Sequence, residues 1–233
     1  MFPVAILSGG LATRLGLVTK TIPKALVPIN GVPFVSHQLK RLKEQGVSKV
    51  VICVGHLGEL IKAEVGDGEK FGLQILYSSD GDTLLGTGGA IKKATSLLGD
   101  TFFIMYGDSF LTINMLLVQQ AFVNSKSRAM MVVFKNKNKI EQSNVVLHKN
   151  IISEYNKTEK NYKMEYIDYG LSVVSREVFS EYPEQVKIDL GDIFYKLSIG
   201  RKLAGFETGE RFYEIGSIDG IKETEKYFQN KNL

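Results

Sequence analysis

Short apolar runs alternate with amphipathic stretches along the first part of the chain, and this alternation restricts the fold more than any other feature. The runs are Val4–Leu7, Val50–Val54, Leu73–Tyr77, Phe102–Tyr106 and Met130–Phe134. Helical spacing of apolar residues connects them between Pro33 and Gly46, over Leu57–Val65 and Ile113–Phe122, and around Ala90–Leu98. Strands that alternate with helices form a mostly parallel sheet with helices on both faces. We therefore expect an α/β fold, a Rossmann-like three-layer αβα sandwich.

The second part of the chain has a different pattern. Val145–Leu147 and Ile151–Tyr155 flank a polar turn and predict a hairpin. Further strands are expected over Tyr166–Val174, Arg201–Phe206 and Phe212–Ile215, with helices over Asp192–Ser198 and at the C-terminus. No Pro/Ser-rich linker separates the two parts, so we expect one domain over residues 1–233.

Composition and charge exclude several classes of protein. One cysteine in 233 residues excludes a disulfide framework and a cysteine-based zinc site. No apolar run is long enough to cross a bilayer, and the start MFPVAILSGG lacks a basic n-region, so we expect a cytoplasmic protein without a membrane partner. The net charge of +4 comes from scattered residues, which argues against a nucleic-acid partner. A homo-oligomer is neither indicated nor excluded.

A glycine-rich loop follows the first predicted strand. The paired Gly9 and Gly10 let backbone N–H groups approach an anion, and the guanidinium of Arg14 matches the geometry of phosphate. Lys24 adds a second cation. The spacing matches neither a Walker A loop nor G-x-G-x-x-G, and alone it also fits an ordinary glycine turn.

Two more features follow predicted strands. Gly86-Thr87-Gly88-Gly89 begins a helix, where small residues let a flat ring lie on the backbone and the helix N-terminus favours anions. Asp108 follows the strand Phe102–Tyr106, and a carboxylate there suits Mg²⁺, which combines one or two carboxylates with substrate phosphates. Each feature alone also fits a plain cap or turn. Together, at strand ends of one sheet, they predict a phosphate and metal site.

With these motifs the sequence resembles the sugar-phosphate nucleotidyltransferase family over nearly its whole length. The matching segments are Gly9-Gly10 with Thr13-Arg14-Leu15, Pro23-Lys24-Ala25-Leu26, Leu85–Ala90, Tyr106-Gly107-Asp108 and Phe212–Ser217. It looks most like the short, single-domain bacterial members, such as heptose-1-phosphate guanylyltransferases and N-acetylmuramate-1-phosphate uridylyltransferases. The resemblance implies the nucleotide-diphospho-sugar transferase fold, with a nucleotide-binding half over 1–135 and a sugar-phosphate-binding half over 136–233.

The resemblance also implies a reaction and its residues. An NTP and a sugar 1-phosphate would give an NDP-sugar and pyrophosphate, for bacterial surface polysaccharide or cell-wall precursors, with guanylyl or uridylyl transfer favoured. The nucleotide-binding residues would be Ser8, Gly9, Gly10, Thr13, Gly86 and Thr87. The catalytic cations would be Arg14 and Lys24, the Mg²⁺ ligands Asp108 and Glu214, and the sugar-phosphate contacts Lys157 and Gly170.

Some assignments stay open at this stage. Glu214 stands where the family often has an aspartate, and Lys160 competes with Lys157 for the acceptor phosphate. A cytidylyltransferase for phosphocholine or another small phosphate is an alternative, and so is a nucleotide or sugar-nucleotide sensor that has no enzyme activity. A glycosyltransferase is disfavoured, because Asp108 stands in no D-x-D pair and Arg14 suits a leaving pyrophosphate.

Overall fold

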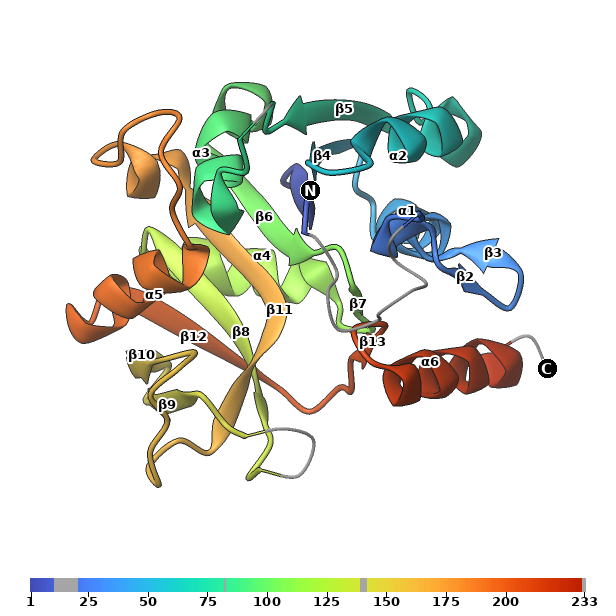
Figure 1. The fold of residues 1–233 in the computed structure, drawn as a ribbon. Coiled ribbons are helices and arrows are strands. Elements are labelled where there is room, and N and C mark those ends of the chain that lie inside the picture. Colours follow the sequence, from blue (N-terminus) through green and yellow to red (C-terminus); the bar gives the residue numbers. More distant parts are fainter. Residues whose placement is uncertain (11–20, 82, 139–141, 232–233) are drawn as a thin grey trace.

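A nine-stranded sheet runs through the computed structural model, which describes residues 1–10, 21–81, 83–138 and 142–231 (Figure 1). Its strands are β1 (Val4–Ser8), β4 (Lys49–Val54), β5 (Gln74–Ser79), β6 (Thr101–Tyr106), β8 (Ala129–Lys135), β9 (Val145–His148), β10 (Ile151–Tyr155), β11 (Tyr166–Ser175) and β12 (Leu203–Thr208). Their spatial order is β5-β4-β1-β6-β11-β8-β12-β10-β9. Strands from both parts of the chain therefore share one sheet.

Most of these strands point the same way. β5, β4, β1 and β6 pair in parallel, and so do β8 and β12. β11 is antiparallel to both of its neighbours β6 and β8, and β10 is antiparallel to both β12 and β9. Because β10 and β11 alone are reversed among the nine, the other seven share one direction. The mostly parallel sheet is confirmed, with a late strand inserted at its centre.

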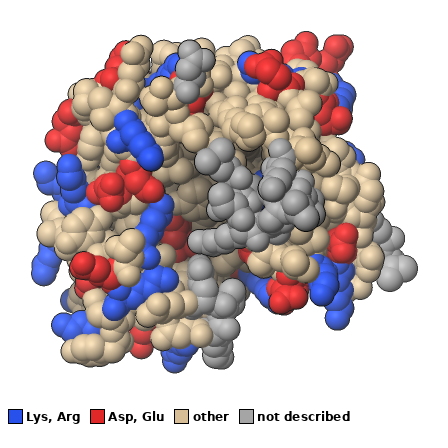
Figure 2. All heavy atoms as spheres, in the orientation of Figure 1, with Lys and Arg blue, Asp and Glu red and all other residues tan. Residues whose placement is uncertain are grey.

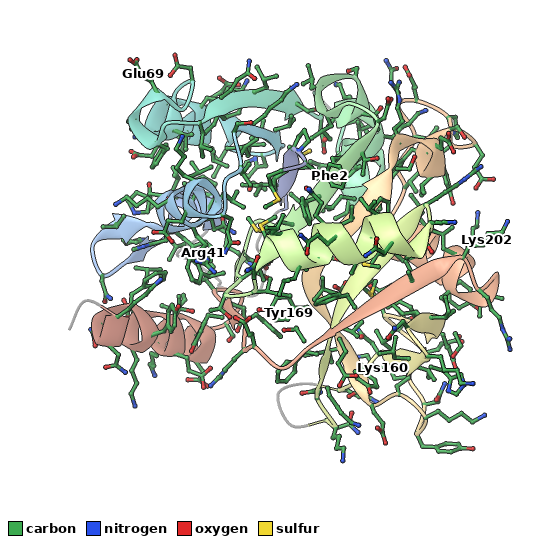
Figure 3. The ribbon with its side chains drawn as sticks, turned by 180° about the vertical axis from the view of Figure 1, so that it is seen from behind. Phe2, Arg41, Glu69, Lys160, Tyr169 and Lys202 are labelled. Atoms are coloured by element: carbon green, nitrogen blue, oxygen red, sulfur yellow. The ribbon has the colours of Figure 1, made fainter. Side chains whose placement is uncertain are left out.

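Helices cover both faces of the sheet. Alternate residues of a strand point to opposite faces: Val4 and Ile6 pack with α1 (Phe34–Glu44), α2 (Gly58–Val65) and α4 (Met115–Ser125), whereas Ala5 packs with α3 (Gly86–Leu98) and α5 (Leu190–Ile199). Figure 3 shows α4, in light green, lying across the first of these faces. The three-layer αβα class predicted from the sequence is confirmed. None of the described helices is long and apolar enough to cross a membrane.

A third, smaller apolar cluster lies beside the sandwich. It joins the 3₁₀ turn η2 (Lys24–Leu26), the hairpin of β2 (Pro28–Ile29) and β3 (Val32–Pro33), the strands β7 (Ser109–Phe110) and β13 (Tyr213–Glu214), and α6 (Ile218–Lys231). Its buried members are Val27, Ile29, Phe34, Phe110, Ile215 and Phe228. The cluster holds together segments from the start, middle and end of the chain, and the predicted site residues Lys24, Asp108 and Glu214 lie in or directly beside them.

Most predicted elements are present, with shifted boundaries. The hairpin is confirmed, since β9 and β10 pair around Lys149 and Asn150, whose φ angles of 48° and 62° form the tight turn. α3 begins at Gly86, as the glycine cluster predicted, whereas α5 begins at Leu190, earlier than predicted. Asp189 explains this shift, because its side chain accepts the Gly191 N–H and caps the helix.

Gly107, the residue after β6, lets the backbone pass close to the end of β1. Its N–H donates to the Leu7 carbonyl at 3.0 Å, and a Cβ at this position would clash with that carbonyl and with Ser8 Oγ. We expect Gly107→Ala to lower the free energy of unfolding by about 1–3 kcal/mol, because backbone cannot give way as a flexible side chain does. Urea unfolding followed by circular dichroism measures the loss.

Gly209→Ala is the matched control. A Cβ at Gly209 meets nothing within 4 Å, so the free energy of unfolding should change by no more than about 0.5 kcal/mol. Equal losses in the two variants would contradict the close approach at Gly107 as the cause.

Candidate functional site

Two carboxylates from distant parts of the sequence meet through a short ribbon. β7 and β13 pair antiparallel, with Glu214 opposite Ser109. The Ile215 N–H then donates to the Asp108 carbonyl at 3.0 Å, which extends the ribbon by one bond. Asp108 and Glu214, the two predicted metal ligands, are therefore brought to the same end of β6.

Lys24 joins this pair from the first part of the chain. Its Nζ lies 3.0 Å from Asp108 Oδ2, and the two side chains are 19% and 38% exposed. Such an ion pair, open to water on one side, contributes little net stability. The Lys24 ammonium and the Asp108 carboxylate are thus held together at low cost and stay accessible to a ligand.

Gly216 lies among all three charged groups. A Cβ built on it would lie 2.6 Å from Glu214 Oε2, 3.6 Å from Lys24 Nζ and 3.7 Å from Asp108 Oδ2. The Gly216 N–H donates to Glu214 Oε2, and Ser217 Oγ donates to Glu214 Oε1 at 2.6 Å. A side chain at position 216 would fill the space between the two carboxylates and the ammonium.

The two carboxylates have the chemistry that Mg²⁺ prefers. Among the described residues, no three His, Cys, Asp or Glu side chains gather into a complete metal site. Mg²⁺ does not need one, because it commonly takes one or two protein carboxylates and completes its shell with phosphate oxygens and water. Asp108 is partly exposed, and each Glu214 oxygen keeps a lone pair beyond its hydrogen bond, so both fit that role.

A polar stripe on α1 fixes the segment that carries Asp108. The buried Gln38 donates from Nε2 to the Ser109 carbonyl at 2.8 Å and to the Tyr106 carbonyl at 3.3 Å, on either side of Asp108. One turn further along α1, Arg41 donates to the Thr112 carbonyl at 2.6 Å. Figure 3 labels Arg41 on this helix. The position of Asp108 therefore depends on helix side chains as well as on the strand.

An irregularity in β11 places a second group of polar residues near the first. The register of β11 against β8 shifts between Asp168 and Ser172, and Gly170 adopts a φ of +88°. Asp168 Oδ1 accepts the Gly170 N–H at 2.9 Å, and Oδ2 accepts the Tyr106 hydroxyl at 3.2 Å. Burial, together with the Asp168 charge, raises the pKa of Tyr106 well above its usual value, so the hydroxyl keeps its proton. The predicted sugar contact Gly170 lies beside Tyr106 and Ser109.

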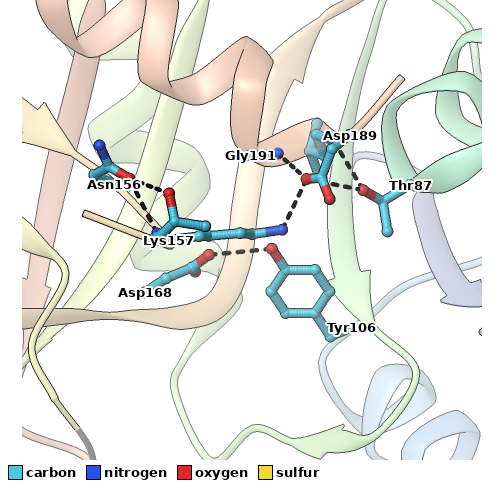
Figure 4. Close-up of polar contacts among 9 residues, drawn as sticks. Thr87, Tyr106, Asn156, Lys157, Asp168, Asp189 and Gly191 are labelled. Atoms are coloured by element: carbon cyan, nitrogen blue, oxygen red, sulfur yellow. Dashed lines mark hydrogen bonds and ion pairs between the residues drawn. The ribbon is translucent and has the colours of Figure 1, made fainter. Parts of the chain in front are cut away.

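Lys157 lies next to this group and pairs with Asp189. Its Nζ is 2.8 Å from Asp189 Oδ1, which also accepts the Gly191 N–H at 2.6 Å (Figure 4). Lys160, the alternative in the sequence, donates instead to the Gln142 carbonyl. Figure 2 shows a hollow near the centre of the face drawn there, with basic and acidic side chains along one side of it.

The second glycine cluster, Gly86–Gly89, is hydrogen-bonded to the segment around Ile188. The Gly88 and Gly89 N–H groups donate to the Ile188 carbonyl at 2.8 and 3.2 Å, and a Cβ on Gly86 would lie 2.6 Å from that oxygen. Thr87 Oγ1 accepts the Leu190 N–H at 2.8 Å. The N–H groups of Gly88 and Gly89 are therefore committed, and we correct the expectation that they are free for an anion. The nucleotide roles of Gly86 and Thr87 stay predictions.

The first glycine loop is described only at its start. Ser8 ends β1, and its buried Oγ has no hydrogen-bond partner among the described residues. Gly9 lies against Gly55, whereas Gly10 has no atom within 4 Å of a built Cβ and is exposed. Thr13 and Arg14 lie outside the described residues, and their roles stay predictions.

Sequence reasoning missed three residues that organise the site. Asp189 precedes Asp192 by three positions, an N-cap pattern that could have been found. Gln38 is an isolated polar residue on the apolar face of a predicted helix, which is the signal of a buried hydrogen-bonding role. Asp168 is an acid inside an apolar strand, but no sequence pattern pairs it with Tyr106.

The chain is similar to known proteins in sequence and in fold. The sequence profile described as "nucleotidyl transferase" matches residues 4–181. The D-glycero-alpha-D-manno-heptose 1-phosphate guanylyltransferase of Campylobacter jejuni is 32% identical over 91% of this chain and 93% of its own length. The protein of the same name from Aneurinibacillus thermoaerophilus is 27% identical over 97% of both chains. The crystal structure of HddC from Yersinia pseudotuberculosis complexed with GMP-PN, at 23% identity, has a TM-score of 0.82 over 98% of this chain and 100% of that one. It shows the same fold.

Replacing Gln38 should release the segment that carries Asp108. We expect Gln38→Met to lower the free energy of unfolding by about 1–3 kcal/mol, because two buried carbonyls lose their donor while the side-chain volume is kept. Thermal and urea unfolding measure the loss. Gln120→Met, on the exposed face of α4, is the control and should be nearly neutral. An unchanged free energy of unfolding in Gln38→Met would contradict the role of these two bonds.

Proposed function

The chain belongs to the nucleotidyl transferase family, and we propose that it joins an NTP and a sugar 1-phosphate to give an NDP-sugar and pyrophosphate. The observation that carries this proposal is the similarity to two heptose 1-phosphate guanylyltransferases over 91% and 97% of the chain. The same relatives favour guanylyl transfer and a sugar acceptor, and they lend no support to a phosphocholine cytidylyltransferase. A role in polysaccharide or cell-wall precursor synthesis and a cytoplasmic location belong to the same proposal.

The chemistry of this reaction suits the side chains of the site. A phosphate oxygen of the acceptor attacks the α-phosphorus of the NTP in line, a P–O bond forms, and pyrophosphate leaves. With a second pKa near 6, the acceptor phosphate is already anionic at neutral pH, so no general base is required. Catalysis then consists of positioning and of neutralising charge on the leaving group.

The described residues divide these tasks between two groups. Asp108 and Glu214 would hold Mg²⁺, which when bound supplies charge neutralisation and alignment of the phosphate oxygens. Lys24 supplies a protein cation at the same place, 3.0 Å from Asp108. Lys157, paired with Asp189, would receive the acceptor phosphate, and Gly170, bonded to Asp168 on β11, would lie near the sugar. Arg14 is proposed as a further cation on the leaving group.

A pyrophosphate-release assay tests the reaction class and identifies the substrates. Purified protein with Mg²⁺ is incubated with GTP, UTP, CTP, ATP or dTTP, each combined with sugar 1-phosphates, including a heptose 1-phosphate, and with phosphocholine. We expect release with GTP and a sugar 1-phosphate and its abolition by EDTA. Binding of an NTP without release from any pair would favour the sensor, and absence of both would contradict the proposal.

Asp108→Asn tests the proposed role of Asp108 and Glu214 as Mg²⁺ ligands. We expect Asp108→Asn to lower kcat about 10²–10³-fold, as losing one preorganised charge contact does at comparable sites. Asp219→Asn is the control, because Asp219 is 93% exposed on α6, and its turnover should stay within twofold of the wild type. Circular dichroism confirms that both variants fold. Near-normal turnover by Asp108→Asn would remove Asp108 from the mechanism.

A further inference from the structure

The first turn of α5 holds Lys157 at two points. At the head of the side chain, Nζ lies 2.8 Å from Asp189 Oδ1. Along the stem, Cδ and Cε lie so close to Gly191 that a Cβ built there would be 2.8 Å from each of them. Asp189 caps α5, and Gly191 is its second residue, so one helix start makes both contacts. Figure 4 shows the Lys157 side chain extending toward Asp189 across this turn.

Asp189 is a carboxylate with three donors on one oxygen. Oδ1 receives Lys157 Nζ, the Gly191 N–H at 2.6 Å and the Thr87 hydroxyl at 3.4 Å. Burial alone would raise the pKa of Asp189, but the hydrogen bond and charge of Lys157, with the other two donors, outweigh it and lower the pKa. Asp189 therefore carries its full charge at neutral pH and gives the ammonium a fixed partner.

The segment that carries Asp189 is itself fastened to the start of α3. The Ile188 N–H donates to the Leu85 carbonyl at 2.9 Å, and the Ile188 carbonyl accepts from two N–H groups at the start of α3. The Leu190 N–H donates to Thr87 Oγ1 at 2.8 Å. The contact to Lys157 thus starts from backbone that is hydrogen-bonded on both sides of Asp189, rather than from a free loop.

We infer that Asp189 and Gly191 form a cradle that positions Lys157 for the acceptor phosphate, a role that rests on the function proposed above. A free lysine side chain loses rotamer entropy when a ligand immobilises it, and this loss weakens binding. The cradle orders the side chain before the ligand arrives. One N–H of the ammonium faces Asp189, which leaves the other two to bind phosphate oxygens. Asp189 acts through Lys157 and is a positioning residue.

Kinetics of Asp189→Asn test the role. Asparagine is as good an N-cap as aspartate, so α5 stays capped while the charge that faces Lys157 is lost. We expect the KM for the acceptor to rise about fivefold to tenfold, with the KM for the NTP within twofold and kcat changed less than the acceptor KM. Asp192→Asn, which removes an exposed charge from the same helix turn, should leave all three constants unchanged. An unchanged acceptor KM in Asp189→Asn would overturn the role.

Gly191→Ala separates positioning from stability. Alanine favours a helix over glycine, so the substitution costs α5 no helix propensity. The cradle predicts a raised acceptor KM, because the added methyl group would lie 2.8 Å from the Lys157 stem and 2.9 Å from Asp189 Oδ1 and so displaces one from the other. A Gly191→Ala enzyme with the wild-type acceptor KM would contradict it.

A second measurement does not depend on turnover. Trace labelling with acetic anhydride, followed by peptide mass spectrometry, gives the reactivity of the Lys157 amine relative to that of Lys160. We expect this ratio to rise at least threefold in Asp189→Asn and to stay constant in Asp192→Asn. An unchanged ratio overturns the cradle, whatever the assays show. If the wild-type protein releases no pyrophosphate but the labelling ratio still rises in Asp189→Asn, the proposed function is contradicted and the cradle stands.

Discussion

The pairing of β7 with β13 is the contact on which the rest of the site depends. Each strand has two residues, and alone such a ribbon would be marginal in water. The third apolar cluster supports it, with Phe110 of β7 and Ile215, the residue after β13, packed in one cluster with Phe228 of α6. Because Asp108 and Glu214 are attached to opposite strands of this ribbon, the last helix of the chain fixes the distance between two carboxylates near the central sheet.

Both described lysines of the site are held by carboxylates in the same manner. Lys24 pairs with Asp108 and Lys157 pairs with Asp189, at 3.0 and 2.8 Å, and all four side chains keep contact with water. Partly exposed ion pairs of this kind are worth about 0–1 kcal/mol. A phosphate ligand can therefore share or replace each carboxylate partner with little loss, while the empty protein keeps its ammonium groups in place. Weak pairing serves recognition better than a strong buried pair would.

The sequence predicted the parts of the molecule that follow from local pattern. The apolar runs predicted the strands of the sheet, the loop cation Lys24 and the strand-end acid Asp108 were found from local pattern, and the family resemblance added Glu214. The structure brings these three residues together. The helix start at Gly86–Gly89 was expected to favour an anion because it looks open when read locally, yet the Ile188 carbonyl accepts the Gly88 and Gly89 N–H groups. Contacts such as Asp168 with Tyr106 and Asp189 with Lys157 depend on tertiary packing, which no periodicity encodes.

The place of β11 in the sheet has a consequence for synthesis on the ribosome. β6 and β8 are complete by residue 135, but each pairs with β11, whose last residue is Ser175. Until β11 emerges, the nascent chain exposes apolar strand edges, the kind of surface that pairs with other chains and aggregates. Residues 1–135 therefore cannot complete their part of the sheet alone, and its completion waits for β11.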